Sequence, residues 1–232
     1  MITVGIIGAM DEEIEQLKSK MDIISAKMIV DTEFFMGKMA NKNVVIVRSG
    51  IGKVNAAICT QVLIDLYGVD YVINTGVAGA ISPDLNIGDI VISRDLVHHD
   101  FDVTNFGYPL GTIPRMSDSF FKADHALIKL AQSACESVLQ DESCFIGRIA
   151  TADSFVSDSE QKRRISEHFD ALCVEMEGAA IAQVAMLNKV VFVVIRSISD
   201  KADEQADTTF DEFVKVAAKN ASSVVENIII NL

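Results

Sequence analysis

The stretch that decides the fold is Val190-Val191-Phe192-Val193-Val194-Ile195, which runs directly into Arg196-Ser197-Ile198-Ser199-Asp200. The first part is apolar at every position, and β-branched side chains dominate it. Short apolar runs of this kind are typical of strands that are covered on both faces of a sheet. Comparable runs occur at Val4 to Ile7, Val44 to Val47, Tyr71 to Ile73, Ile87 to Ile92 and Phe145 to Ile149. The chain is therefore predicted to build a buried sheet.

Helical patterns lie between these runs. One predicted helical face is apolar and is followed by Gly68, a suitable C-terminal cap; it carries Val54, Ala57, Ile58, Val62 and Leu66. A longer stripe extends from Phe210 to Ile228, and the stretches 157–160 and 209–212 resemble capping boxes. Strands that alternate with helices indicate a mainly parallel sheet with helices on both faces. Residues 26–48 are instead typical of a hairpin with its turn at 41–43, so the sheet is predicted to be mixed.

Composition narrows the class of protein. The 232 residues contain no linker, repeat or low-complexity tract, so a single domain over residues 1–232 is expected. The net charge of −13 disfavours nucleic acid and anionic membranes as partners. No membrane-spanning stretch or signal peptide is predicted. The four cysteines form no Cys-x-x-Cys pair, which favours free thiols in the cytoplasm and no metal site.

Ligands bind beyond the carboxyl ends of the strands in sheets of this kind. Six segments in that position are rich in glycine, hydroxyl and carboxylate side chains: 8–13, 49–53, 75–80, 151–156, 175–178 and 196–200. The first of them, Gly8 to Glu13, ends in three carboxylates and lacks the GxGxxG pattern, so it is not expected to hold phosphate. Its acids either complement a helix dipole or act in catalysis.

Two other segments carry acids suited to chemistry. Asp200 ends a strongly apolar strand, where desolvation raises the pKa of a carboxyl group and lets it donate a proton. The alternative is a helix cap or an ion pair with Arg196. Glu175 and Glu177 flank a methionine where a strand gives way to a helix, and a carboxylate there can accept both hydroxyls of a ribose. The alternative is that either one is a solvated acid at a helix start.

The pair His98-His99 lies next to Asp100 and Asp102. Adjacent residues of a strand point to opposite faces and no second cluster supplies ligands, so a metal site is not expected. The nearby aromatic loop, which includes Phe106, is suited to covering a partner subunit or a ligand.

Taken together, five segments resemble the 5'-methylthioadenosine/S-adenosylhomocysteine nucleosidases, in order and spacing over essentially the whole chain. These segments are Gly5 to Met10, Ser49 to Val54, Asn74 to Gly76, Val174 to Ala180 and Arg196 to Asp200. The resemblance implies a three-layer α/β/α sandwich with a mixed central sheet, of the nucleoside phosphorylase-like type. It also implies a homodimer that needs no metal or organic cofactor.

The resemblance further implies residue roles. Glu13 would activate the attacking water, and Asp200 would protonate N7 of the purine. Glu177 would hold the ribose hydroxyls. The other substrate-binding positions would be Met176 beside the ribose, Gly79 and Ser199 along the pocket, Arg196 near the water and the diol, Phe155 and Val156 at the base, Ile51 and Phe210 at the 5' group, and Phe106 and Pro114 from the partner subunit.

The chain departs from the family pattern in two places. Val77 stands where many members carry serine, which removes a hydroxyl near the attacking water, and Thr151 to Phe155 varies around the usual Ser-Gly-Asp-x-Phe. The expected activity is hydrolysis of methylthioadenosine and S-adenosylhomocysteine, with 5'-deoxyadenosine as a further candidate and no ranking among them. The alternatives are a phosphate-dependent nucleoside phosphorylase, an aminofutalosine-type nucleosidase and a non-catalytic nucleoside-binding module.

Overall fold

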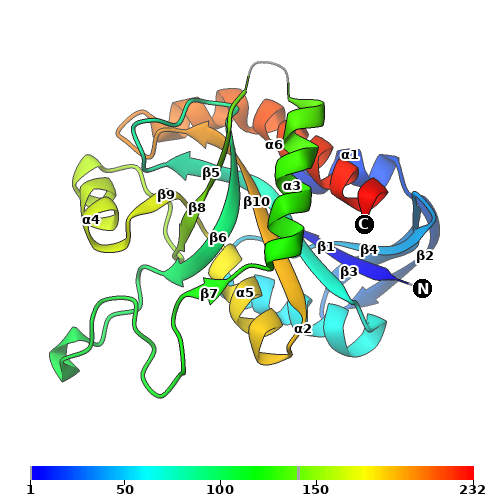
Figure 1. Ribbon diagram of the computed structural model, residues 1–232, viewed down its shortest axis with the longest axis horizontal. Coiled ribbons are helices and arrows are strands. Elements are labelled where there is room, and N and C mark those ends of the chain that lie inside the picture. Colours follow the sequence, from blue (N-terminus) through cyan, green and yellow to red (C-terminus); the bar gives the residue numbers. More distant parts are fainter. Residues whose placement is uncertain (1, 140–141) are drawn as a thin grey trace.

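The computed structural model describes residues 2–139 and 142–232. Ten strands and six α-helices alternate along this part of the chain (Figure 1). The strands are β1 (Thr3–Gly8), β2 (Asp22–Ile29), β3 (Thr32–Met39), β4 (Lys42–Arg48), β5 (Tyr71–Ala80), β6 (Ile90–His98), β7 (Phe121–Lys122), β8 (Cys144–Thr151), β9 (Ala171–Glu175) and β10 (Val191–Asp200). The helices are α1 (Asp11–Ser19), α2 (Lys53–Tyr67), α3 (His125–Val138), α4 (Ser159–Phe169), α5 (Gly178–Leu187) and α6 (Ala206–Asn231).

The strands form one mixed sheet. Nine of them follow the order β10-β6-β8-β9-β5-β1-β4-β3-β2, and the short β7 pairs with β6 beside this path. Strand β10 pairs in parallel with β5 and antiparallel with β6, so β10, β6, β8, β9 and β5 close into a ring. Beyond β5 the sheet continues as an open extension that ends at β2. This arrangement brings the carboxyl ends of β5, β9 and β10 close to that of β1, where the predicted ligand segments lie.

Two hydrophobic clusters lie on the two sides of the sheet. Helices α2 and α5 contribute to one, and α1, α3 and α6 contribute to the other (Figure 1). The predicted α/β/α sandwich with a mixed sheet is confirmed. Most apolar residues of the six predicted runs are buried, which is why these runs lack the alternation of a half-exposed strand; Ile146 and Val191 are the exposed exceptions.

Several local predictions need correction. The runs at 71–73 and 190–195 are only the first halves of β5 and β10, because both strands continue in register through the polar residues that follow. The hairpin is confirmed as β3 and β4, but β2 adds a third strand and the turn has its left-handed residues at Ala40 and Asn41. Helix α6 begins at Ala206, before the predicted capping box, and the cap of α4 is Asp158 rather than Ser157.

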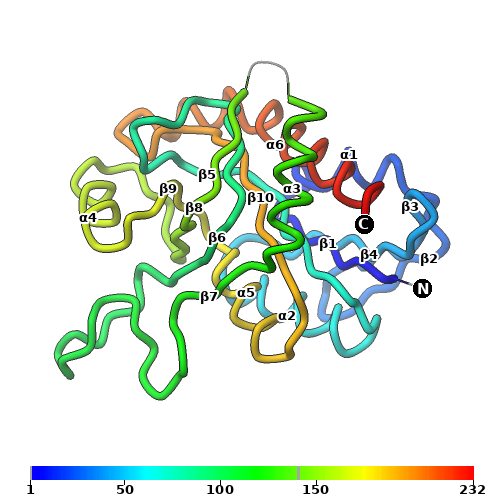
Figure 2. Tube along the Cα trace, viewed as in Figure 1, coloured from blue at the N-terminus to red at the C-terminus, as the bar shows by residue number. Residues whose placement is uncertain are grey.

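The apolar face predicted for α2 is not the side of the helix that packs against the sheet. Gly68 does end the helix in the left-handed conformation, at φ 59°. However, the helix buries Ala56, Cys59 and Leu63 against the sheet, and the predicted apolar face is partly open to solvent: Val54 is 69% exposed and Leu66 60% exposed. The helix is therefore apolar on more than one side. The segment between β6 and β7 also reaches away from the sheet (Figure 2). Among the described residues, no helix combines the length and the apolar character needed to cross a membrane.

Candidate active site

Asp200 owes its position to an irregular strand end. The pairing of β10 with β5 shifts register between Ile198 and Asp200, which places Asp200 opposite Gly79. The carboxylate is only 2% exposed, and it accepts hydrogen bonds from the Ser199 hydroxyl at 2.9 Å and from the backbone N–H of Ala202 at 2.9 Å. Burial raises the pKa of Asp200, against the effect of these two hydrogen bonds. The side chain is thus suited to hold a proton and to deliver it to a ligand.

Glu13 lies in the first turn of α1, directly after β1. Its Oε2 accepts the backbone N–H groups of Ala9 at 2.6 Å and Met10 at 3.0 Å, and its Oε1 accepts that of Val77 at 3.0 Å. Burial raises the pKa of Glu13, and the nearby Arg196 guanidinium and the three backbone donors oppose this rise. The acids of the turn therefore do not share one role: Glu13 is buried, whereas Asp11 and Glu12 are exposed.

Glu177 begins α5 and points toward the same region. Its Oε1 accepts the backbone N–H of Gly52 at 2.8 Å, and its Oε2 lies 3.6 Å from the Arg196 guanidinium. Burial, followed by the charge of Glu175, raises the pKa of Glu177 to about 8. Glu177 and Glu175 are both buried, so the alternative of a solvated acid at the helix start does not hold for either residue.

Arg196 is fully buried among these carboxylates. One of its terminal nitrogens, Nη2, donates to Asn74 at 2.7 Å and to Glu175, while the other, Nη1, lies 3.9 Å from Glu13. A Cβ at Gly76 would come within 1.9 Å of Nη1 and 2.4 Å of Glu13 Oε1. Glycine at this position of β5 is therefore what allows the guanidinium and the Glu13 carboxylate to approach each other.

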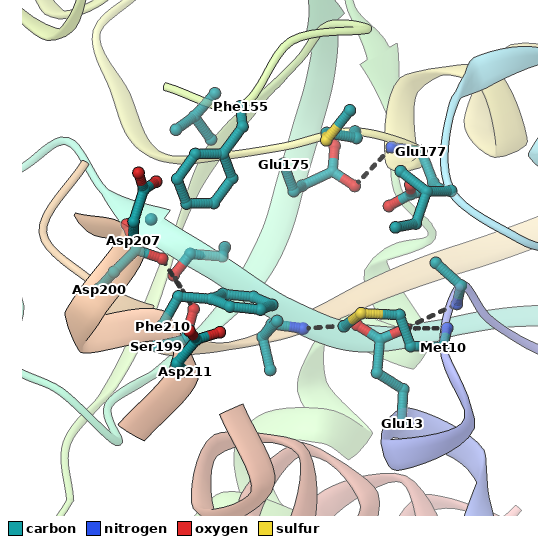
Figure 3. Close-up of a pocket in the computed structure, with 17 residues that line it drawn as sticks. Met10, Glu13, Phe155, Glu175, Glu177, Ser199, Asp200, Asp207, Phe210 and Asp211 are labelled. Carbon is teal, nitrogen blue, oxygen red and sulfur yellow. Dashed lines mark hydrogen bonds between the residues drawn. The ribbon is translucent and has the colours of Figure 1, made fainter. Parts of the chain in front are cut away.

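A cavity of about 480 Å³ joins these groups (Figure 3). Asp200 and Phe155 lie on one side of it, and Glu13 lies on the other, near Met10. The Phe155 and Phe210 rings meet edge to face, with centroids 5.8 Å apart, and form an apolar wall. The lining residues are Ala9, Met10, Glu13, Ile51, Val77, Ala78, Gly79, Phe155, Val174, Glu175, Met176, Glu177, Ser199, Asp200, Asp207, Phe210 and Asp211.

Most of the predicted site residues line this cavity: Glu13, Ile51, Gly79, Phe155, Met176, Glu177, Ser199, Asp200 and Phe210. Val156 lies behind Phe155, at a small adjoining cavity of about 30 Å³. Arg196 is fully buried and does not line the cavity. Phe106 and Pro114 do not line the cavity of their own chain, and Phe106 is 81% exposed.

Sequence reasoning missed several lining residues. Asp207 and Asp211 lie on the first turns of α6. They were missed because the helix was predicted to begin later, at the capping box of residues 209–212. The four-residue spacing of Asp207 and Asp211, with Phe210 between them, was the available signal, since residues at i and i+4 share a helix face. His98 and His99 take no part in the cavity: His98 bonds Gln183 at 3.0 Å, and His99 packs against Phe169.

The cavity is suited to a neutral ligand with hydroxyl groups. Its described lining contains several carboxylates but no lysine or arginine, and the buried Arg196 is already surrounded by three acids. A phosphate group at the site of attack would need cationic donors. Two buried carboxyl groups on different sides of the cavity match the acid and the base that glycosidic bond cleavage requires.

Comparison with known proteins agrees with this geometry. The sequence profile of the phosphorylase superfamily matches residues 3–230. A 5'-methylthioadenosine/S-adenosylhomocysteine nucleosidase from Marinomonas sp. (strain MWYL1) is 42% identical over 230 residues, which cover 99% of each chain. The crystal structure of such a nucleosidase from Neisseria meningitidis, in complex with methylthio-immucillin-A, has a TM-score of 0.96 and 42% identity, and it covers 100% of both chains.

A third solved structure is also similar to this chain. The native structure of futalosine hydrolase from Helicobacter pylori strain 26695 has a TM-score of 0.95 and 35% identity, and it covers 100% of this chain and 98% of that one. Profile, sequence and structure agree over nearly the full length, and the chain belongs to the 5'-methylthioadenosine/S-adenosylhomocysteine nucleosidase family of the phosphorylase superfamily.

Proposed function

We propose that this protein hydrolyses the N-glycosidic bond of 5'-methylthioadenosine and S-adenosylhomocysteine, releasing adenine and the thioribose. One observation carries the proposal: Asp200 and Glu13, two buried carboxyl groups with raised pKa values, face one cavity from different sides, and Glu177 faces it as well. A protein that only binds a nucleoside has no need for a proton donor and a proton acceptor arranged in this way.

The chemistry follows from the positions of these groups. Asp200 donates its proton to N7 of the adenine, so that the C1'–N9 bond breaks and the base leaves as neutral adenine. Glu13 takes a proton from water as the water oxygen bonds to C1', and Glu177 accepts hydrogen bonds from the ribose hydroxyls. Phe155 stacks on the base. Each acid or base of this kind contributes about 100- to 10,000-fold to the rate.

The products of a phosphate-free reaction test the proposal. We expect adenine and free 5-methylthioribose to form from methylthioadenosine in buffer without phosphate, because no cationic phosphate site lies in the described lining. Chromatography of the products, with and without added phosphate, provides the measurement. A strict phosphate requirement with a ribose 1-phosphate product would establish a phosphorylase, and no base release at all would favour a binding module.

The candidate substrates share adenine and ribose and differ only at the 5' substituent. Any preference among them therefore depends on the contacts of that substituent. The futalosine hydrolase of H. pylori shares the fold and 35% of the sequence, so aminofutalosine stays in the substrate panel beside 5'-deoxyadenosine. Steady-state kcat/KM values for the four nucleosides rank them. We further propose that the enzyme works in the cytoplasm, where its four free cysteines stay reduced.

We also propose that the protein is a homodimer whose partner subunit completes the cavity. Ile51 lines the cavity and is 54% exposed, and the neighbouring α2 presents Val54 and Ile58 to solvent. Such a row of exposed apolar side chains beside a ligand site is typical of a covered interface. Phe106, on the segment that reaches away from the sheet, is suited to covering the cavity of the other subunit (Figure 2).

If the partner subunit completes the cavity, a substitution that weakens the dimer should also lower the activity. The Ile58→Asp protein is expected to dissociate at least about tenfold more readily, which corresponds to about 1.4 kcal/mol, because a charge would be buried in an apolar interface. Its kcat/KM should fall at concentrations where monomers prevail. Sedimentation velocity and activity over a dilution series measure both quantities. Met28→Asp, at an exposed apolar residue of β2, serves as the control, and an unchanged dimer or a fully active Ile58→Asp monomer would contradict the proposal.

A further inference from the structure

Glu175 is a buried carboxylate at the end of β9, and both of its oxygens accept hydrogen bonds from neighbouring groups. Its Oε2 accepts the backbone N–H groups of Glu177 at 3.0 Å and Gly178 at 2.7 Å, together with Nη2 of Arg196. Its Oε1 accepts the hydroxyl of Thr151, and that hydroxyl in turn accepts the backbone N–H of Ala179 at 2.9 Å. Such a set of donors matches an ionised carboxylate and leaves no place for a donor on Glu175 itself.

The first consequence concerns Glu177. Its backbone is fixed through its own N–H and that of the next residue, so Glu175 and Thr151 together hold the first turn of α5. The Glu177 side chain is then anchored by Gly52 at one oxygen, while the other oxygen faces Arg196 at 3.6 Å. The orientation of the predicted ribose-binding carboxylate therefore depends on a neighbour two residues earlier in the chain.

The second consequence concerns Arg196. Glu175 and Asn74 bind the same terminal nitrogen, Nη2, which leaves Nη1 and Nε buried without hydrogen-bond partners among the described residues. Nη1 lies 3.9 Å from Glu13, too far for a direct hydrogen bond. Without Glu175, the guanidinium would pair directly with Glu13 or Glu177, because these are the remaining buried acids in reach. A directly paired Glu13 would be a weaker proton acceptor.

We propose that Glu175 is a positioning residue for the hydrolytic reaction: it ties down Arg196 so that Glu13 stays free to accept a proton from water, and it fixes Glu177 toward the ribose. This inference rests on the function proposed above and adds a residue that does not itself carry out proton transfer. Glu175 acts through Arg196 and Glu177, and its loss should therefore affect both turnover and substrate binding.

The Glu175→Gln variant tests the idea with little change of shape. The amide would turn an N–H donor toward groups that are themselves donors, so we expect kcat to fall about 10- to 100-fold and KM to rise. Glu160→Gln, at an exposed acid of α4, is the matched control. Melting temperature and circular dichroism establish that both variants are folded.

A pH profile separates positioning from a merely structural role. The charge of Glu175 helps to raise the pKa of Glu177, which also faces Arg196, Glu13 and the N–H of Gly52. Removing that charge should move the pH dependence of KM toward lower pH, whereas a loss of packing alone would not shift it. Thr151→Val provides a second test if Glu175→Gln does not fold, since it removes one hydrogen bond and keeps the charge. Thr60→Val, at a buried threonine of α2, is its control.

The outcomes are distinct. A folded Glu175→Gln protein with wild-type kcat, KM and pH profile would overturn the inference, as would a wild-type kcat for Thr151→Val if Glu175→Gln cannot be folded. A wild-type protein that releases no adenine would instead overturn the proposed function. Active wild type, reduced Glu175→Gln and a shifted pH profile support the positioning role.

Discussion

The Asp200→Asn protein is expected to release adenine about 100- to 10,000-fold more slowly than the wild type, with little change in KM. Asparagine keeps an oxygen for the N–H of Ala202, and the Ser199 hydroxyl can rotate to accept from the amide, so the local structure should persist. What is lost is the acidic proton that Asp200 can carry, which burial favours by raising the pKa of this carboxyl group. Steady-state kinetics on methylthioadenosine, with base release followed by chromatography, gives the comparison.

The pH dependence of the rate gives a second test of proton donation by Asp200. A proton donor must be protonated, so the wild-type rate should fall as the pH rises through the raised pKa of Asp200, and Asp200→Asn should lack this alkaline limb. Asp84→Asn, at an exposed acid, should behave as the wild type. An Asp200→Asn protein with more than about a tenth of the wild-type kcat would argue against proton donation by Asp200.

Glu13→Gln is the second large effect, with an expected loss of about 100- to 10,000-fold in kcat/KM. Glutamine cannot accept a proton from water. The amide must also place an N–H near the N–H of Val77 or those of Ala9 and Met10, which costs about 1–3 kcal/mol of stability. Thermal unfolding therefore has to accompany the kinetics, at a temperature where the variant is fully folded.

The exposed neighbour Glu12 supplies the control, because Glu12→Gln changes the same charge without touching the cavity. The base must be deprotonated to act, so the wild-type rate should rise as the pH rises through the pKa of Glu13, and this acidic limb should disappear in Glu13→Gln. A folded Glu13→Gln protein that keeps both its rate and its acidic limb would assign the base to another residue.

Most of the sheet could be predicted because strands that are buried on both faces are apolar at nearly every position. The runs in β1 and β4 carry no polar side chain, and all their apolar side chains are buried. The second halves of β5 and β10 were not predicted as strands because most of their residues are small or polar, although the two segments pair in parallel with each other. Strand β9 was expected only as the strand that ends near Glu175, because five residues next to a helix offer too short a pattern to set its bounds.

The exposed apolar face of α2 has a physical explanation. Amphipathic periodicity finds an apolar face, but it does not say whether the same chain or another molecule covers that face. In α2 the sheet-facing side is lined by small residues such as Ala56 and Cys59, so the larger Val54, Ile58 and Leu66 on the open side dominate the pattern. In the proposed dimer, this side of α2 would be covered by the partner subunit.

The assembly of the site could not be predicted from local sequence patterns. Glu13, Glu177 and Asp200 could be selected as candidates because each lies at the end of a strand, yet their meeting depends on pairing between β1, β5 and β10, which are far apart in the sequence. The buried carboxylate Glu175 was indistinguishable from Glu177 in the sequence. Only the contacts with Arg196 and Thr151 separate the two.

The most direct test of the account uses a methylthioadenosine analogue with carbon in place of N7. If Asp200 drives departure of the base by protonating N7, this 7-deaza analogue should bind with an affinity close to that of the substrate, as a competitive inhibitor, and should release no measurable base from the wild-type enzyme. Release of 7-deazaadenine at a rate comparable to that of adenine would contradict the account, because the bond would then break without the proton that Asp200 is positioned to give.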